Sequence, residues 1–479
     1  MSPRYDAVVV GAGPNGLAAA IVLAREGHSV LVLEANDTIG GGCRTANITL
    51  PGFTHDICAA VHPMGVVSPF LKELPLEQYG LQWVHSPAPL AHPFDDGSAA
   101  VLHRSLDRTG ATIGPDARAW SRLMRPYLRK GEAFFGEVLK PVRVPRHPLL
   151  MARFGLTGLR SCQSIVTSRF TGPRARALFA GCAAHSFLPL DVPGSAAFGL
   201  VLALVGHATD WPVVRGGSQR IVDAMAQHLA SMGGTIHTAH PVRSLEDLPP
   251  SRVVLFDLMP AAVERIAGAA LPDAYRRQLQ RYRYGAGVFK VDWALRGPIP
   301  WRARECSTAA TVHLGGTFEE IAASEGAANQ GHHSDRPFVL VAQQSLFDDS
   351  RAPRGGHTGW AYCHVPNGST VDMTDRIESQ IERFAPGFRD LILARRGMTT
   401  ADVERHNANM VGGDIGGGAN DLRQFLFRPF PRWNPYATRN PRFFLCSSAT
   451  PPGGGVHGMC GYWAARAALK QLRRPTDPH

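Results

Sequence analysis

The chain has 479 residues, 44% of them hydrophobic and 19% charged, with a net charge of +11. This length predicts two domains, and the composition excludes a disordered chain. No run approaches the ~20 apolar residues that a membrane-spanning helix needs, so residues 195–206 (SAAFGLVLALVG) are predicted to be a buried helix.

The positive charge is concentrated in one stretch. Residues 118–176 hold 13 Lys and Arg but only two acids, Glu132 and Glu137. Within residues 141–160 the arginines are interleaved with Leu, Met and Phe, a pattern that suits an anionic membrane surface. A solvated basic face over an ordinary core is the alternative. Nucleic acid is disfavoured, because no binding module is recognised and aromatic residues do not interleave with the charges.

Eight cysteines show no C-x-x-C pair and no regular spacing. They predict reduced thiols in a cytoplasmic protein, without a structural metal site. The first expected strand leaves no room for a signal peptide before it. We therefore expect a cytoplasmic protein, with peripheral membrane contact through the basic stretch as an additional possibility.

The N-terminal segment predicts a strand, a glycine turn and a helix. An apolar run, Ala7 to Val10, ends where Gly11, Gly13 and Gly16 stand at G-x-G-x-x-G spacing, with Pro14 and Asn15 inside the turn. Such glycines permit a tight turn, close approach to a pyrophosphate and close helix packing, while the helix N-terminus attracts phosphate. The pattern therefore predicts a dinucleotide site.

A second strand, Val30 to Leu33, ends at Glu34 and Ala35. An acid at this distance from the glycine turn can accept hydrogen bonds from the adenosine ribose. Gly40, Gly41, Gly42 and Arg44 follow, and they predict a second close backbone approach and a cation near the same pyrophosphate.

The middle of the chain alternates between two kinds of pattern. Residues 68–210 suggest helices and loops without a βαβ rhythm, which we interpret as a substrate-binding cap. The dinucleotide-binding pattern resumes at Trp211 with a helix, the strand Thr235 to Thr238 and a valine-bearing strand at Val242. Residues 282–439 suggest further strands, of which the first carries Lys290 and Asp292 on one face.

The C-terminal part of the chain contains another glycine-rich turn. Residues 442–447 are an expected strand, and residues 448–469 (SATPPGGGVHGMCGYWAARAAL) are a glycine turn leading into a helix. Backbone N–H groups around Gly455, Val456, Gly458 and Met459 are expected to approach the cofactor. The N-terminus of this helix would favour negative charge there.

Together these segments resemble the FAD-binding flavoproteins of the amine oxidase and phytoene desaturase type. The Glu-x5-Gly-Gly signature with its following Arg, the block WPVVRGGSQ, and the segments YGAGVFKVDWAL, GGDIGGG and SATPPGGGVHGMCGY resemble the phytoene dehydrogenase-like branch. The resemblance implies an α/β fold. A discontinuous Rossmann-like FAD-binding domain (residues 1–67, 211–283 and 440–479) would join a mixed-sheet and helical substrate-binding domain (residues 68–210 and 284–439). One departure is that Cys446, Ser447 and Ser448 stand where relatives often carry Gly-Asp.

The resemblance also implies the site. FAD would be bound without a covalent link, with the backbone at Val242 meeting the adenine. Lys290 is placed like a lysine that holds water near flavin N5, although a structural pair with Asp292 is an equal alternative. His457 and Tyr462 flank the last turn and are the other catalytic candidates, with structural roles as the alternative. His185 and Asp414 are further cavity candidates.

We therefore predict an FAD-dependent oxidoreductase that removes or adds hydrogen at carbon–carbon bonds of a hydrophobic, isoprenoid or conjugated substrate. Hydride would pass to or from flavin N5, with oxygen, a quinone or NAD(P) as the electron acceptor. The alternatives are a flavin amine oxidase, a carotenoid-type isomerase and a non-catalytic lipid or prenyl carrier. The glycine signatures at both ends of the chain argue against the carrier.

Overall fold

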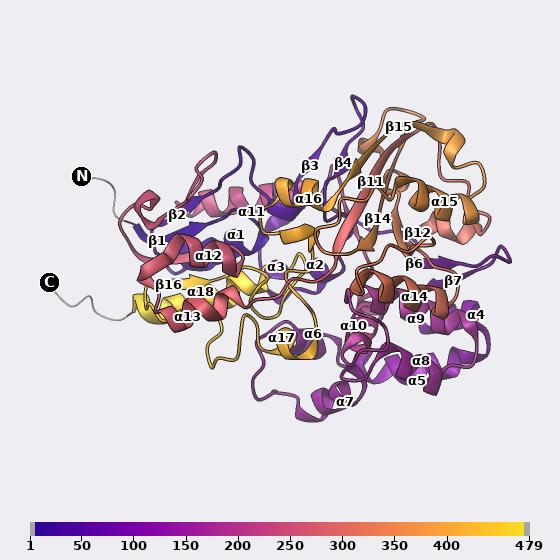
Figure 1. The fold of residues 1–479 in the computed structure, drawn as a ribbon, viewed down its shortest axis with the longest axis horizontal. Coiled ribbons are helices and arrows are strands. Elements are labelled where there is room, and N and C mark those ends of the chain that lie inside the picture. The colour runs from indigo at the N-terminus through magenta and orange to yellow at the C-terminus, as the bar shows by residue number, and fades with distance from the viewer. Residues whose placement is uncertain (1–4, 474–479) are drawn as a thin grey trace.

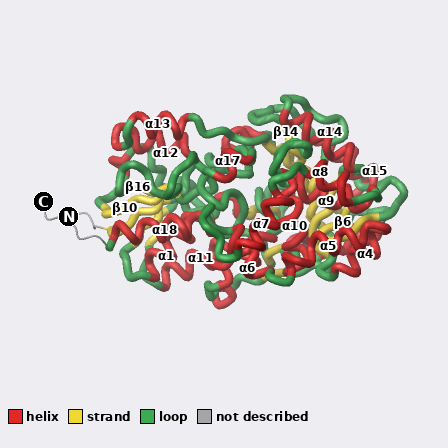
Figure 2. Tube along the Cα trace, turned by 90° about the horizontal axis from the view of Figure 1, so that it is seen from below, coloured by secondary structure: helices red, strands yellow, loops and turns green. Residues whose placement is uncertain are grey.

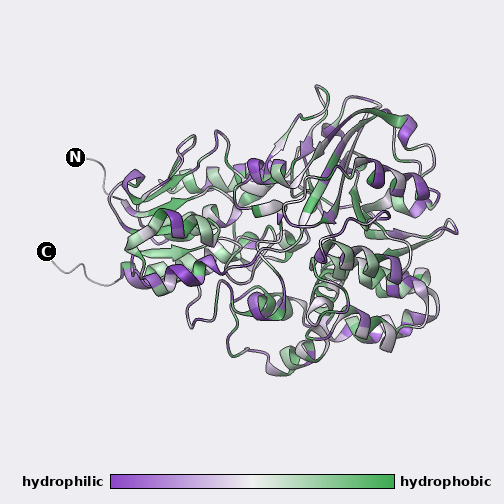
Figure 3. Ribbon diagram, viewed as in Figure 1, coloured by the Kyte–Doolittle hydropathy of each residue, from purple (hydrophilic) through white to green (hydrophobic). Residues whose placement is uncertain are grey.

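A five-stranded parallel sheet assembles from segments far apart in the sequence (Figure 1). The structure is a computed structural model, and it describes residues 5–473. The strand order is β16-β10-β1-β2-β9. The bounds are β1 (Tyr5–Val10), β2 (Val30–Leu33), β9 (Thr235–His237), β10 (Ser251–Phe256) and β16 (Phe443–Leu445). These Val- and Leu-rich strands, mostly green in Figure 3, are typical of a sheet buried on both faces.

Helices cover both faces of this sheet. Alternate strand residues pack on α1 (Pro14–Arg25), α11 (Gln219–Ser231) and α18 (Met459–Leu472) on one side. The residues between them pack on α12 (Pro260–Ala267) and α13 (Asp273–Gln280) on the other. The contact between α1 and α18 is close, because a Cβ on Gly461 would overlap the carbonyl oxygen of Asn15.

A second, mixed sheet has seven strands in the order β15-β11-β14-β13-β12-β6-β7. Its neighbours pair antiparallel, except that β6 and β12 run parallel. The bounds are β6 (Ala88–Pro93), β7 (Ala99–Leu102), β11 (Gly287–Leu295), β12 (Ala309–Leu314), β13 (Val339–Ala342), β14 (His357–Val365) and β15 (Ile392–Met398). Helix α15 (Thr374–Phe384) packs on this sheet through Ile377, Ile381 and Phe384.

A group of helices lies beside the mixed sheet (Figure 2). It comprises α4 (Leu106–Ile113), α5 (Ala117–Leu128), α6 (Gly131–Val138), α7 (Pro148–Gly158), α8 (Cys162–Arg169), α9 (Pro173–Ala184) and α10 (Ser195–Ala208). The other α-helices and strands are α2 (Pro63–Val67), α3 (Pro69–Lys72), α14 (Phe318–Asn329), α16 (Thr400–His406), α17 (Leu422–Leu426), β3 (Thr45–Ala46), β4 (His55–Asp56), β5 (Trp83–Val84) and β8 (Val213–Val214). No helix of the described part of the chain is long and apolar enough to cross a membrane.

The α/β class is confirmed, with a discontinuous Rossmann-like parallel sheet joined to a mixed sheet and helices. The stretch 68–210 consists largely of helices and loops, as predicted, and it also contributes β6 and β7 to the mixed sheet, a pairing hidden because APLAHP and AAVL hold few β-branched or aromatic residues. One local expectation was wrong. Val242 lies in a loop rather than a strand, next to Pro241, which cannot donate to a ladder. The exact domain bounds stay a prediction, and residues 1–4 and 474–479 of those ranges lie outside the described residues.

A buried ionic network fixes the segment after the first glycines to the mixed-sheet region. Arg351 donates to Asp56 at 2.9 Å and to Asp348 at 2.7 Å, and all three side chains are fully buried. Asp56 also accepts the N–H of Ser218 at 2.7 Å. Burial raises the pKa of Asp56, but the Arg351 charge and these hydrogen bonds outweigh it and hold that pKa below its usual value. Removing one partner would leave a buried charge, so the network joins these segments firmly.

Candidate functional site

One large cavity of about 820 Å³ extends from the parallel sheet to the helical group. This volume lies in the upper part of the range for ligand-binding pockets. The walls at one end come from the glycine turns and strand ends of the parallel sheet. Those at the other end come from α7, α10, α17 and the mixed sheet. Both predicted domains therefore contribute to a single space.

The first glycine turn forms part of the cavity wall through Gly11, Gly13, Pro14 and Asn15. Gly11 has a φ of +104°, a conformation that favours glycine. Gly16 lies behind the wall, and a Cβ there would overlap the carbonyl oxygen of Gly11. The turn brings the N-terminus of α1 to the cavity, where the positive end of the helix dipole would attract an anion.

Glu34 and Ala35 lie in the wall at the end of β2, and Val242 lies there from its loop. One carboxylate oxygen of the buried Glu34 accepts the N–H of Ala12 at 2.8 Å. The other accepts the N–H of Asn36 at 3.0 Å. These bonds orient the carboxylate at the predicted ribose position and leave lone pairs for further donors.

Asp257 is a wall residue that the sequence analysis did not single out. It follows β10 directly, and its Oδ2 accepts the N–H of Gly16 at 2.9 Å. A Cβ on Gly13 would come within 2.8 Å of the same oxygen. Burial raises the pKa of Asp257 to about 7, and the nearby charge of Glu34 adds to the rise. A strand ending in Asp (RVVLFD) was the available signal.

A second glycine segment faces the first. Gly41 and Gly42 lie in the wall, whereas Arg44 lies behind them and donates to the carbonyl oxygens of Gly41 and His406. Residues 407–410 (NANM) also line the cavity beside this segment. Asn409 fixes that loop, because its side chain donates to the carbonyl oxygen of Asp257 at 2.7 Å. The sequence offered no periodic signal for this contribution.

The C-terminal turn contributes Gly455, Val456 and His457 to the wall, while Gly458 and Met459 lie behind it. The Nδ1 of His457 accepts the N–H of Met459 at 3.0 Å, at the start of α18. Burial lowers the pKa of His457 to about 4, so the ring is neutral at physiological pH. Tyr462 points elsewhere and packs on Phe70, with ring centroids 5.7 Å apart. The catalytic roles of both residues stay predictions, with the structural roles as the alternative.

Lys290 is buried on β11 and forms an ion pair with Asp292. Its ammonium also lies 5.7 Å from the centre of the Trp360 ring. Burial raises the pKa of Asp292 to about 6 despite the lysine charge.

A small cavity of about 10 Å³ lies beside Lys290, close to the least space that one water requires. Its walls include Cys58, Trp360, Tyr362, Met410 and Ile415, which also line the large cavity. One layer of side chains therefore separates Lys290 from the large cavity.

The other end of the large cavity is apolar. Its side chains come from α7, α10, β13 and α17: Met151, Phe154, Ala197, Phe198, Val201, Leu202, Leu340, Leu422, Phe425 and Leu426. The two carboxylates in these walls are already engaged. Glu137 pairs with Lys140, and Asp414 accepts N–H groups from Gly285, Gly416 and Gly418.

His185 also reaches this part of the wall. Its Nε2 lies 3.1 Å from the Nε2 of the buried His313, so one ring donates to the other. Burial lowers the pKa of His185 to about 3, and that of His313 falls well below its usual value. The pair is therefore neutral at physiological pH and can orient a ligand without adding charge.

The sequence and the fold were compared with those of known proteins. The profile of the family described as "NAD(P)-binding Rossmann-like domain" matches residues 9–74. The chain contains a Rossmann-like nucleotide-binding domain. The chain is 27% identical, over 99% of its own length and 94% of the relative's, to pyridine nucleotide-disulfide oxidoreductase domain-containing protein 2 of Mus musculus.

Two further comparisons are informative. A 95-residue stretch, 19% of this chain and 14% of the relative, is 42% identical to all-trans-retinol 13,14-reductase of Danio rerio. Among solved structures, putrescine oxidase bound to putrescine superimposes with a TM-score of 0.63 and 18% identity, covering 99% of this chain and all of the other. The chain therefore has the fold of that amine oxidase.

At the glycine-lined end, the lack of room for side chains indicates whether the wall fits FAD. A Cβ on Gly41 would come within 3.4 Å of the Cα of Gly13, so two backbones approach closely across the wall. The Oδ1 of Asn15 is buried without a hydrogen-bond partner in the described chain. A cradle of bare backbone beside an unpaired polar atom fits a dinucleotide that supplies the missing partners.

Proposed function

We propose that this chain is an FAD-dependent oxidoreductase acting on carbon–carbon bonds of a hydrophobic, isoprenoid or conjugated substrate. It would be a member of the phytoene dehydrogenase-like branch. The observation that carries the proposal is the single cavity, whose glycine-lined end suits a dinucleotide and whose other end is apolar. The two ends meet near the C-terminal glycine turn, where a cofactor ring and an apolar chain could lie together.

The cofactor would be held mainly by backbone. The turn at Gly11, Gly13, Pro14 and Asn15, supported by Gly16, would receive the pyrophosphate at the α1 N-terminus. Glu34 would accept hydrogen bonds from the ribose, with Ala35 and Val242 beside the adenine. Gly41, Gly42 and Arg44 would close the pyrophosphate from the opposite side. Gly455 and Val456, with Gly458 and Met459 behind them, would face the flavin ring, and binding would be non-covalent.

FAD bound in this way would supply a two-electron acceptor or donor at flavin N5, reoxidised or reduced by oxygen, a quinone or NAD(P). The chain's own contribution is alignment and exclusion of water. The apolar wall would hold the substrate's reacting carbons against the glycine turn. The neutral rings of His457 and His185 add no competing charge there.

An apolar substrate is favoured over an amine by the charges around the apolar end. Its wall carboxylates are engaged, Lys140 is neutralised by Glu137, and the remaining wall cation, Arg143, would repel an ammonium group. The flavin amine oxidase alternative requires aromatic walls facing the flavin, and Trp360 and Tyr362 are the aromatic residues of β14 that line the cavity. The isomerase alternative shares the proposed site and differs only in the absence of net electron transfer.

Lys290 would act through water rather than by touching substrate. The small cavity beside it can hold one water, and the layer of Cys58, Trp360 and Tyr362 separates that water from the large cavity. A small movement of this layer would bring the water towards the flavin. His457 and Tyr462 would support the C-terminal turn and α18, His457 through its bond to Met459.

Anaerobic reduction of the purified protein tests this function. FAD-loaded protein would be mixed with a polyene or isoprenoid alcohol and, separately, with putrescine and cyclohexylamine, while flavin absorbance is followed. Bleaching by the isoprenoid alone supports the proposal, and bleaching by the amines alone would favour an amine oxidase. A colourless protein that binds no added FAD would favour the lipid carrier, and binding of NAD(P) alone would exclude a flavoprotein.

A further inference from the structure

Helix α7 is apolar on two opposite faces. Its inner face contributes Met151 and Phe154 to the cavity wall. On its outer face Leu149 is 88% exposed and Leu156 is 79% exposed, and these two residues are separated by two helical turns. A helix that is apolar all round is normally buried. The outer face of α7 therefore lacks the cover that such a surface usually has.

The chain before and after α7 extends this exposed apolar surface. Val144 is 92% exposed, Val142 is 63% exposed and Leu159 is 51% exposed. Arg143, Arg146 and Arg153 are exposed among them. We call these eight residues the α7 surface: Val142, Arg143, Val144, Arg146, Leu149, Arg153, Leu156 and Leu159.

The stretch of chain that carries the α7 surface has charge of a single sign. Residues 138–190 hold eight Lys and Arg and no Asp or Glu. The acid just before this stretch, Glu137, is buried and paired with Lys140. The α7 surface thus combines apolar side chains with unpaired positive charge.

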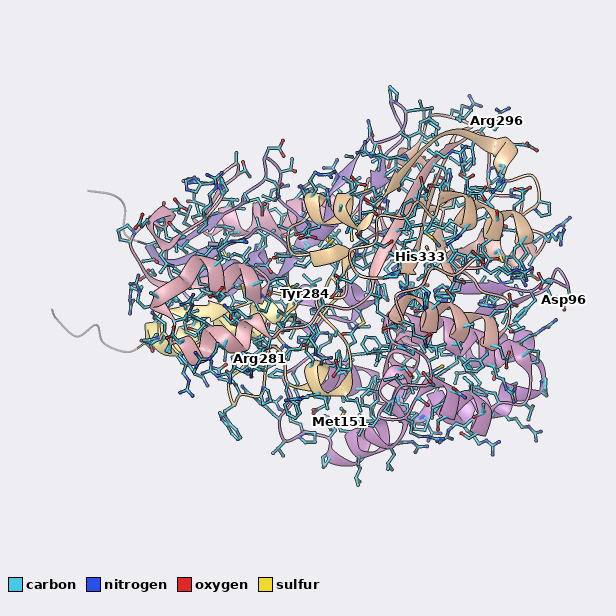
Figure 4. The ribbon with its side chains drawn as sticks, in the orientation of Figure 1. Asp96, Met151, Arg281, Tyr284, Arg296 and His333 are labelled. Atoms are coloured by element: carbon cyan, nitrogen blue, oxygen red, sulfur yellow. The ribbon has the colours of Figure 1, made fainter. Side chains whose placement is uncertain are left out.

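The same residues border the substrate end of the cavity. Val142, Arg143 and Leu159 belong both to the α7 surface and to the cavity wall. Figure 1 shows α7 at the lower edge of the molecule, and Figure 4 shows Met151 labelled there. An apolar molecule that leaves this surface would therefore meet the cavity wall without crossing the folded core.

We propose that the α7 surface docks on an anionic lipid bilayer and admits apolar substrates from it to the cavity. Leucines and valines would enter the boundary between headgroups and acyl chains, while the arginines pair with lipid phosphates and carboxylates. Docking depends on the surface alone. Admission of substrate rests on the proposed function.

A bilayer fits this surface better than a second copy of the chain. A twofold interface would place the α7 surface against itself, so that its three arginines would face a second surface that also carries only positive charge. Such like charges repel, whereas an anionic leaflet attracts each of them. The exposed leucines also project from one continuous face, as in helices that lie in the plane of a membrane.

Flotation with lipid vesicles tests docking directly. Purified protein would be mixed with phosphatidylcholine vesicles, with and without phosphatidylserine, at low and high salt. We expect binding to the phosphatidylserine vesicles that falls as salt rises. The triple variant R143Q/R146Q/R153Q should lower the partition coefficient at least ~10-fold. L149S/L156S should lower it by a similar factor while leaving the melting temperature unchanged.

Matched variants elsewhere on the surface control for charge and exposure. L393S changes a leucine that is 46% exposed outside the α7 surface. R265Q/R277Q/R281Q removes three exposed arginines from α12, α13 and the residue after α13. Both controls should bind vesicles like the wild type.

Several outcomes would overturn the proposal. Two concern the wild type: equal partition into neutral and anionic vesicles, or no partition into either. Two concern the variants: a loss of vesicle binding in the controls equal to that in the α7 variants, or a dimer that L149S/L156S dissociates. Flavin plays no part in this measurement. Vesicle binding by a protein that binds no added FAD would therefore refute the proposed function alone, and flavin reduction without vesicle binding would refute docking alone.

Discussion

The two ends of the cavity are built in different ways. The glycine-lined end is formed largely by backbone from short segments in which neighbouring residues act together, such as the turn at Gly11 and Gly13. The apolar end is formed by side chains from α7, α10, β13 and α17, which are separated by up to about 280 residues. Backbone recognition requires glycine at particular spacings, whereas apolar recognition accepts many residue types. The first end should therefore tolerate substitution poorly and the second well.

Gly16→Ala, which adds one methyl group at the glycine-lined end, should lower FAD affinity more than any other substitution considered. The new Cβ would overlap the carbonyl oxygen of Gly11, so the turn must open and the pyrophosphate site is lost. We expect FAD affinity to fall by more than ~100-fold, as measured by fluorescence titration. Gly326→Ala is the control, since its Cβ would meet nothing within 4 Å inside α14. Tight FAD binding by Gly16→Ala would show that this turn does not hold the cofactor.

Lys290→Met separates the structural role of this lysine from its proposed role near the flavin. Methionine leaves Asp292 buried without its partner, so we expect a loss of about 3–5 kcal/mol in stability. The double variant Lys290→Met with Asp292→Asn removes the stranded charge and should recover most of this loss. Stopped-flow measurement of the double variant should show slower reoxidation by oxygen with nearly unchanged flavin reduction. Unchanged rates in both half-reactions would leave Lys290 a purely structural residue.

Glu34→Ala should weaken FAD binding by about 1.5–3 kcal/mol, because charge-assisted hydrogen bonds to the ribose are lost. Glu34→Gln should be milder, since an amide can still accept and donate. Isothermal titration of both variants with FAD measures the difference. If affinity is the same in both variants and the wild type, the ribose lies elsewhere.

The smallest expected effect is a pH dependence set by Asp257. Its pKa is raised to about 7 in the folded protein, above the ordinary value of 3.8, so the folded state binds the extra proton. The resulting stability is fully present below pH 3.8 and is lost as the pH rises through about 7. An ionised Asp257 would also repel the pyrophosphate, so FAD affinity should fall by up to roughly fivefold between pH 7 and 8, the fall in the protonated fraction of a group with this pKa.

Asp257→Asn should bind FAD equally at both pH values and show a flatter melting temperature between pH 5 and 8. A wild-type affinity that does not change with pH would place Asp257 away from the phosphates. If Asp257→Asn keeps the wild-type dependence of FAD affinity on pH, another group is responsible for the titration.

The same contrast explains how much the sequence could predict. The strands, the first helix and the glycine turns follow local rules of spacing and periodicity, so the parallel sheet could be predicted closely. The place of Asp257 could have been predicted, because an acid directly after a buried strand lies at the same sheet edge as the glycine turn. The position of the loop 407–410 could not be predicted, since it depends on a hydrogen bond from Asn409 to a residue about 150 positions away.

The apolar end was described only as a cap. Leucines and phenylalanines of α10 and α17 resemble ordinary core residues, because a cavity wall and a packed core use the same side chains. The pairing of β6 with β12 is also non-local and carries weak strand propensity. Two roles were open for Lys290: an ion pair with Asp292, or a hydrogen bond to water near the flavin. Weighing them required the position of Asp292 and the small cavity beside Lys290. Sequence could name both roles without deciding between them.

Titration of the flavin-free protein with FAD tests the central claim most directly, namely that one cavity binds a dinucleotide at its glycine-lined end and an apolar ligand at the other. FAD should bind non-covalently with one molecule per chain, and acid should release it intact. A bound isoprenoid should then perturb the flavin absorbance, whereas NAD(P) should not displace FAD. Failure to bind FAD, or displacement of FAD by the isoprenoid, would contradict the account.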